Sequence, residues 1–322
     1  MKGCLCVTPT RSLVESSLLV GLAVVLFLAA QFLPVVGIGF SFLCPAPLVV
    51  MGLRHDFKKA LLGVAVATGL VMIFMGPLGA LFFLLGFGVL GVGLGQLAKR
   101  LHRGVEILLY GILLSLGSKL LLMVIASKVM GVNPFSVDPV EIESMLNKVF
   151  AFYAGKGLSQ ETIESMKQQM MMTLKIIPLV FPALLTLAAS VDCYLSYVIS
   201  GAVIRRIGSG TLPPLPSFSN WRFPKSIFWA LLVSILFSML GMQQGEASLM
   251  FRMGMNLKLL INILFLLQGL SVIWYYFSLK GLGSFVRWVA VILVLFVPFL
   301  STIALILGVS DMWFDFRSRI RR

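Results

Sequence analysis

The sequence consists mostly of apolar runs long enough to cross a lipid bilayer, and Lys and Arg residues mark the breaks between these runs. A helix needs about 20 apolar residues to span the hydrocarbon core, and helices satisfy all their backbone hydrogen bonds internally. Nine runs approach or exceed that length: 13–33, 35–53, 60–75, 78–98, 105–130, 174–204, 226–242, 257–279 and 288–307. The sequence therefore predicts an all-α, polytopic transmembrane helical bundle of eight or nine spans.

Composition excludes several classes of protein. Hydrophobic residues make up 59% of the chain and charged residues only 12%, so a soluble fold has too little polar surface. The formal charge is +14, but the basic residues lie at the ends of apolar runs, so we predict no nucleic-acid partner. The cysteines and histidines show no metal-ligand or catalytic spacing. We therefore predict no enzyme activity, no cofactor and no metal.

The basic clusters also predict how the chain lies in the membrane. Cytoplasmic loops of membrane proteins are enriched in Lys and Arg. With a cytoplasmic N-terminus, the basic segments 54–59, 99–103, 205–225 and 280–287 all fall on the cytoplasmic side. This pattern is typical of a multi-pass plasma-membrane protein with a cytoplasmic N-terminus. Nine spans would place the Arg-rich tail outside, against the rule, so eight spans with a cytoplasmic tail is the alternative.

The longest segment between spans, residues 131–173, is predicted to form two short amphipathic helices on the extracytoplasmic side. Ser159 is expected to cap the second of these helices. The helices are interpreted either as a lid over a substrate pocket or as an element packed in the interface. We therefore predict one integral membrane domain, 1–322, with five spans in 1–130, the insertion at 131–173, and the remaining spans and tail in 174–322.

Four polar residues fall at mid-membrane depth and are the candidate site residues. Lys119 and Asp192 both lie roughly 20 Å from the cytoplasmic side at 1.5 Å rise per residue, so they are expected to pair. The pair is interpreted as a structural ion pair or as a substrate or proton-coupling site. Asn262 and Gln268 are expected either to form interhelical hydrogen bonds or to line a pocket.

Small residues predict close helix packing in the fourth span. Gly91 and Gly95 form a GxxxG pair, which allows another helix to approach the backbone closely. The same spacing suits packing within one chain and packing between chains.

Two stretches resemble a known family. The segments LPSFSNWRFP at 215–224 and GVSDMWFDFR at 308–317 are similar to those of the YybS-like family of uncharacterised bacterial membrane proteins. This resemblance covers essentially the whole chain. It implies a multi-pass membrane protein and does not imply a specific activity.

The first part of the chain, about 13–103, also resembles the substrate-binding (S) component of energy-coupling-factor vitamin transporters. The resemblance rests on Pro45-Ala46-Pro47, on Gly76-Pro77 and on the glycine-rich segment 86–95 that ends in Lys99-Arg100. It implies binding and uptake of a small molecule, powered by separate ATPase subunits. The chain departs from the Ala-x-x-x-Ala docking face of S components, because Phe27 follows Ala23 at that spacing.

Two functions follow as hypotheses. The first is binding or transport of a small solute, with the lipid bilayer and transport-module subunits as partners. The alternative is a non-transporting membrane scaffold or assembly factor that contacts other membrane proteins. A transporter is expected to have a polar-lined cavity at mid-depth that reaches the four candidate residues. A scaffold is expected to have those residues packed against their neighbours.

Overall fold

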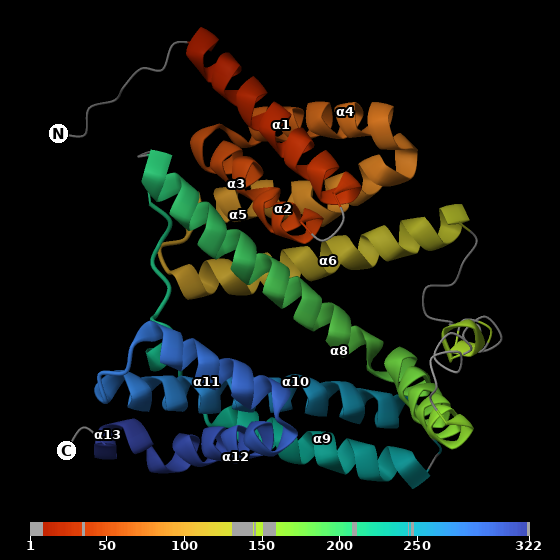
Figure 1. Ribbon diagram of the computed structural model, residues 1–322. Helices are drawn as coiled ribbons and strands as arrows, with labels where there is room; N and C mark the ends of the chain where they lie inside the picture. The colour runs from red at the N-terminus through yellow and green to blue at the C-terminus, as the bar shows by residue number, and fades with distance from the viewer. Residues whose placement is uncertain are drawn as a thin grey trace. The chain divides into compact units, whose positions relative to one another are not determined.

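The computed structural model describes residues 9–33, 36–130, 144, 146–150, 159–207, 211–243, 245 and 248–320. Every regular element among these residues is a helix, which confirms the all-α prediction (Figure 1). Seven helices in this part of the chain are long and apolar enough to span a membrane, and a bent pair adds an eighth when counted as one span. The chain divides into two compact units, Met1–Pro134 with Leu185–Leu215, and Phe135–Leu184 with Pro216–Arg322.

The first unit, called unit 1 below, contains the five spans predicted in 1–130 and the second part of a long helix. Its helices are α1 (Pro9–Phe32), α2 (Gly37–Leu43), α3 (Pro45–Arg54), α4 (Phe57–Phe83), a π-helical turn (Leu84–Gly88), α5 (Val89–Arg100), α6 (Gly104–Met130) and part of α8 (Gln160–Ile207). The second predicted span is interrupted at Cys44, where Pro45 begins α3 at a position that needs no N–H donor.

A sharp turn at Gly76 divides α4 into two antiparallel helices. Gly76 has φ of +73°, a left-handed conformation that glycine adopts without steric cost, and Pro77 follows it. Val64 and Gly88 lie equally far along the chain from Gly76. The Val64 Cγ1 atom lies 2.9 Å from the position of a Cβ on Gly88. The apolar stretch Phe57–Arg100 therefore runs out and back, as the predicted third and fourth spans require.

The glycines singled out in the sequence pack against α3. A Cβ on Gly91 would lie 2.5 Å from the Leu48 Cβ atom, and a Cβ on Gly95 would lie 2.5 Å from the Val49 carbonyl oxygen. These distances are too short for a side chain, so glycine is what allows α5 to approach the α3 backbone. The close approach is therefore a contact within one chain.

The second unit, called unit 2, is built around a helical hairpin. It contains the first part of α8, a short 3₁₀ turn (Phe218–Asn220), α9 (Ser226–Gln243), α10 (Leu249–Leu279), α11 (Ser284–Phe296), α12 (Pro298–Phe314) and α13 (Phe316–Ile320). A Cβ on Gly241 would lie 2.2 Å from the Phe251 backbone nitrogen, and one on Gly254 would lie 2.6 Å from that of Ser238. Helices α9 and α10 are therefore antiparallel and closely packed.

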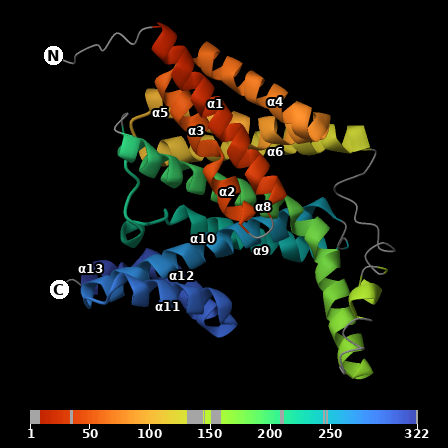
Figure 2. The same ribbon diagram turned by 45° about the horizontal axis from the view of Figure 1, so that its top comes forward.

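The predicted ninth span, 288–307, is not one straight helix. The chain bends by 104° between α11 and α12, where Val297 has an extended conformation. Pro298 causes the break, because its ring disfavours a helical conformation at the preceding residue and it has no N–H to donate. Figures 1 and 2 both show α11 and α12 (blue) folding back on each other beside α10.

The structure describes only part of the predicted insertion, since residues 131–143, 145 and 151–158 lie outside the described ranges. Ser159 caps α8 as predicted, with its Oγ atom 3.4 Å from the Thr162 backbone nitrogen. The same helix continues through Thr173 to Ile207 and contains Pro178 and Pro182. The second insertion helix and the sixth span are therefore one helix, and the boundary predicted at 173 does not fall between two elements.

Candidate functional site

Lys119 and Asp192 form an ion pair inside unit 1. The Lys119 Nζ atom lies 2.8 Å from Asp192 Oδ2 and also donates a hydrogen bond of 2.9 Å to the buried Ser115 hydroxyl. The Lys119 side chain is 15% exposed and the Asp192 side chain 41% exposed. The two charges therefore satisfy each other within the apolar part of the unit, as their matched depths indicate.

The basic segments of unit 1 gather at one end, called the basic end below. Arg54 pairs with Glu15, and Lys99 donates to the His55 carbonyl oxygen. A Cβ on Gly104 would lie 2.9 Å from the carbonyl oxygens of Pro213 and Pro214, which places the loop after α5 beside the loop after α8. These contacts bring three of the predicted cytoplasmic segments together.

His55 is buried at this end, with its Nδ1 atom 3.3 Å from the Ser12 hydroxyl. Burial lowers the pKa of the imidazole, and the nearby positive charges of Lys59, Arg54 and Lys99 lower it further. The imidazole ring is therefore neutral at pH 7, and it packs within the basic end without adding to the positive charge there.

A cavity of about 550 Å³ opens at the other end of unit 1. Its walls come from the end of α1, the Gly76 turn of α4 and the end of α6, and the residues are Phe27, Gln31, Met75, Leu78, Gly79, Leu81, Phe82, Leu122, Met123, Ala126 and Ser127. Phe27 contacts Phe82, Phe83 and Phe87 with ring centroids 5.1–6.3 Å apart. The lining is mostly apolar and aromatic, with one amide and one hydroxyl.

In unit 2 a buried polar network joins the loop before α9 to the end of the chain. We call this network, formed by Ser219, Trp221, Phe223, Gln268, Asp311 and Arg317, the loop–tail clamp. The side chains of Arg317 and Asp311 are each 3% exposed and lie 3.6 Å apart. Arg317 donates hydrogen bonds of 2.6 Å and 2.9 Å to the carbonyl oxygens of Ser219 and Trp221. The guanidinium therefore holds the loop to the end of α12.

Gln268 connects this network to the middle of α10. Its Oε1 atom accepts from the Phe223 backbone N–H at 3.2 Å, and its Nε2 atom donates to Asp311 Oδ2 at 3.2 Å. The other Asp311 oxygen accepts from the Phe316 N–H at 3.1 Å. Burial lowers the pKa of the Arg317 guanidinium, and Asp311 opposes that shift. Each charged group in the clamp therefore has partners that offset its burial.

A second set of contacts covers the clamp. Arg222 pairs with Asp315 at 3.0 Å, and the Lys225 Nζ atom lies 5.6 Å from the centre of the Trp313 ring. Asp315 has φ of +43°, a left-handed conformation that ends α12 and turns the chain into α13. The segments 215–224 and 308–317, which carry the family resemblance, thus lie against each other.

The structure places the four candidate residues in three different environments. Lys119 and Asp192 meet in unit 1, Gln268 joins the clamp in unit 2, and Asn262 is half-buried on α10. None of the four is among the residues that line the cavity described above or the cavity of unit 2 described below.

Asn256 makes a contact between helices α10 and α8 that the sequence analysis missed. Its side-chain amide donates a hydrogen bond of 2.7 Å to the Leu179 carbonyl oxygen of α8 and accepts one of 2.8 Å from the Ala183 backbone N–H. In a regular helix these two backbone groups would bond to each other. Both groups flank Pro182, where the regular helix hydrogen bonding is weakened. The signal in the sequence was Pro178 and Pro182 within one apolar run, opposite a polar residue on a later span.

The fold and these sites define a multi-pass helical membrane protein whose apolar helices require a lipid bilayer. The chain belongs to the family described as "Predicted membrane protein (DUF2232)", whose profile matches residues 21–312. It is 27% identical over 315 residues to the "Uncharacterized protein YybS" of Bacillus subtilis (strain 168), covering 97% of this chain and 99% of that protein. These findings confirm the predicted YybS-like family. No solved structure matches, and the likeness to S components stays a prediction.

Proposed function

We propose that unit 1 binds a small solute in the cavity beside the Gly76 turn, at the end away from the basic end. The observation that carries the proposal is the cavity itself. Its volume of about 550 Å³ lies in the range of small-molecule sites, roughly 300–1,000 Å³. Its lining combines aromatic rings with two polar side chains, Gln31 and Ser127, which is the usual composition of a site for a largely apolar molecule with few polar groups.

The lining of the cavity narrows the class of solute. Lys119 and Asp192 pair with each other and are not among the residues that line the cavity. The cavity lining contains no charged side chain. An uncharged, aromatic or aliphatic solute therefore fits the unit better than an anion or a cation, and the role we propose is non-enzymatic.

Filling the cavity is expected to remove the solute. Ala126→Phe places a ring inside the cavity, whereas Val124→Phe on the same helix changes an exposed side chain that does not line it. Native mass spectrometry of protein purified from its membrane should detect a bound small molecule in the wild type and in Val124→Phe. We expect at least a tenfold lower bound fraction in Ala126→Phe, or about 1.4 kcal/mol of lost binding.

The same purification tests the alternative, a membrane scaffold. The loop–tail clamp favours this alternative, because it holds the segment around Trp221 and the start of α13 in one arrangement, as a docking surface for another membrane protein requires. Recovery of the same protein partner with the wild type and with Ala126→Phe, without any bound small molecule, would replace the solute-binding proposal with the scaffold.

We further propose eight crossings and a re-entrant α11–α12 hairpin in the bacterial plasma membrane, with both chain ends in the cytoplasm. Two contacts support this topology. Arg287, near the start of α11, donates to Ser278 at the end of α10. Arg317, just after α12, binds the loop that precedes α9. The hairpin thus begins and ends at the same end of unit 2.

This topology removes the conflict between the Arg-rich tail and the positive-inside rule. A reporter enzyme that is active only in the cytoplasm, fused after Arg322, is expected to be as active as one fused after Lys280. Activity at Lys280 without activity at Arg322 would mean that the hairpin crosses the membrane, and the nine-span interpretation would then hold.

A further inference from the structure

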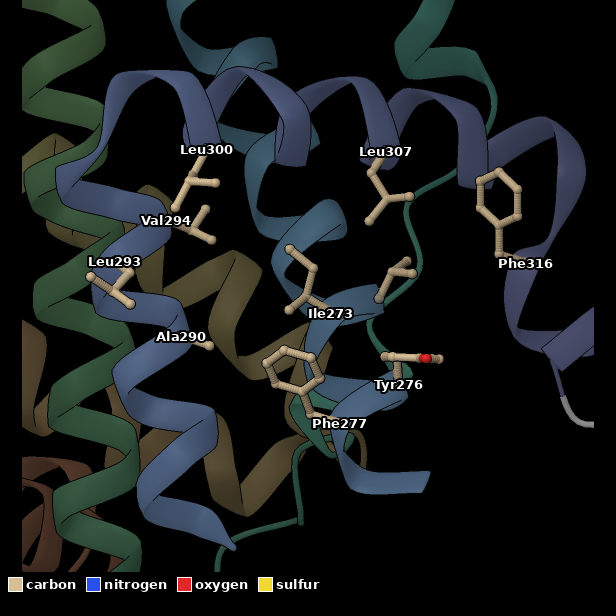
Figure 3. A pocket seen from close by; sticks show the side chains of 10 residues that line it. Ile273, Tyr276, Phe277, Ala290, Leu293, Val294, Leu300, Leu307 and Phe316 are labelled. Carbon is tan, nitrogen blue, oxygen red and sulfur yellow. The ribbon is translucent and has the colours of Figure 1, made fainter. Parts of the chain in front are cut away.

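A second cavity lies entirely within unit 2, in the cleft between α10, α11 and α12. Its volume is about 500 Å³, and its lining is formed by Val272, Ile273, Tyr276, Phe277, Ala290, Leu293, Val294, Leu300, Leu307 and Phe316. Figure 3 shows these side chains pointing toward one space from α10, from both arms of the bent pair and from the start of α13. The cleft exists because the bend at Val297 holds α11 away from α12.

Water does not suit this cleft. A buried water needs two to four polar partners, and cavities lined by aliphatic and aromatic groups stay dry. Tyr276 contributes the only hydroxyl among the residues that line it. Hydrocarbon is the occupant that matches such a surface inside a membrane, since lipid chains are as apolar as the lining.

Positive charge lies at one side of the cleft. The Lys280 Nζ atom is 5.7 Å from the centre of the Tyr276 ring, which lines the cavity. The Arg319 guanidinium is 5.8 Å from the Phe314 ring, and that ring stacks on Phe316, another lining residue, with centroids 6.0 Å apart. Both side chains are exposed. The segments 280–287 and 316–320 contain four Lys and Arg residues and no Asp or Glu.

We propose that the cleft is a binding site for an anionic glycerophospholipid. One acyl chain occupies the space between Phe277, Val294 and Leu307, and the phosphate lies between the charges of Lys280 and Arg319. Apolar burial supplies the affinity for the chain, and the two cations supply the preference for an anionic headgroup. The site lies in unit 2 and is independent of the solute cavity of unit 1.

The test uses the full-length protein in mixed micelles that contain equal amounts of phosphatidylglycerol and phosphatidylcholine, with bound lipid counted by native mass spectrometry. Wild-type protein should retain phosphatidylglycerol over phosphatidylcholine by at least fivefold. Each cation near a phosphate is worth a factor of roughly five, so Lys280→Gln with Arg319→Gln should bring the ratio close to one. Lys258→Gln, an exposed lysine nearer the other end of α10, should leave the ratio unchanged.

Occupancy is tested by a second matched pair on α11. Ala290→Phe fills the cleft and should lower the retained phosphatidylglycerol at least fivefold, whereas Ile292→Phe, at an exposed position that does not line the cleft, should retain as much as the wild type. Equal retention of the two lipids by the wild type would overturn the proposal. So would retention by Ala290→Phe equal to that of Ile292→Phe. The charge variants change exposed side chains only, so they decide the headgroup assignment even if Ala290→Phe folds poorly.

Discussion

Replacement of Arg317 by Met is expected to destabilise the protein by about 3–5 kcal/mol, the cost of removing one partner from a buried ion pair. The side chain is 3% exposed, and it holds Asp311 together with the carbonyl oxygens of Ser219 and Trp221. Without the guanidinium, the Asp311 carboxylate loses its counter-charge and keeps only neutral donors, Gln268 and the Phe316 N–H. The carbonyl oxygens of Ser219 and Trp221 each lose a donor. Thermal unfolding of the full-length protein in detergent should therefore begin at a clearly lower temperature.

The matched control is Lys258→Met, which removes the same charge from an exposed position on α10 and is expected to change stability by less than about 0.5 kcal/mol. A second variant shows how much of the lost stability comes from the unpaired Asp311 charge and how much from lost packing. Adding Asp311→Leu to Arg317→Met removes the stranded carboxylate, so the double variant should regain part of the lost stability. The clamp would lose its assigned role if Arg317→Met unfolded at the same temperature as Lys258→Met.

The clamp also links two segments that lie far apart in the sequence. Residues 215–224 supply the carbonyl groups and the Phe223 N–H, and residues 308–317 supply Asp311 and Arg317. Gln268 holds both segments to α10. A substitution in one segment therefore leaves hydrogen-bonding groups of the other segment without a partner, which lowers stability.

Within the spans, the sequence predicted much of the fold correctly because the bilayer imposes simple rules. Length and hydropathy indicate helices, glycine and proline indicate the turn at Gly76, and equal depth indicates the contact between Lys119 and Asp192. Ser159 was recognised as a cap because its partner is local. Each of these features depends on neighbouring residues or on one coordinate, the depth in the membrane.

The features that were missed depend on tertiary packing. Hydropathy does not distinguish one span from two shorter helices of equal total length, so the bend at Val297 was not recognised although Pro298 marks it. Gln268 was expected to form an interhelical hydrogen bond or to line a pocket, and its bond to Asp311 on α12 is interhelical. Its second partner, the Phe223 N–H, belongs to a loop whose position no periodicity specifies. The cavities likewise form where helices diverge, which the sequence of each helix does not show.

The Lys119–Asp192 ion pair of unit 1 is expected to make the second large contribution to stability. Lys119→Leu and Asp192→Leu are each expected to destabilise the protein, since a lone charge at mid-membrane depth costs roughly 2.5–3.5 kcal/mol. Asp192→Leu should be the more harmful, because the Lys119 ammonium is the less exposed partner and keeps only the Ser115 hydroxyl. The double replacement removes both charges, so it should be milder than the sum of the two single changes, with a coupling of about 1–3 kcal/mol.

The comparison is a double-mutant cycle of thermal unfolding in detergent, with a second ion pair at the start of α6 as the control. Arg103 and Glu106 lie 3.6 Å apart with side chains 83% and 42% exposed, so their coupling should be only about 0.2–0.5 kcal/mol. A coupling at Lys119–Asp192 no larger than this, or a double variant no better than the worse single variant, would mean that the two charges do not depend on each other. A clear coupling with unchanged solute binding would assign the pair to stability of the bundle, because the cavity near Gln31 then works without either charge.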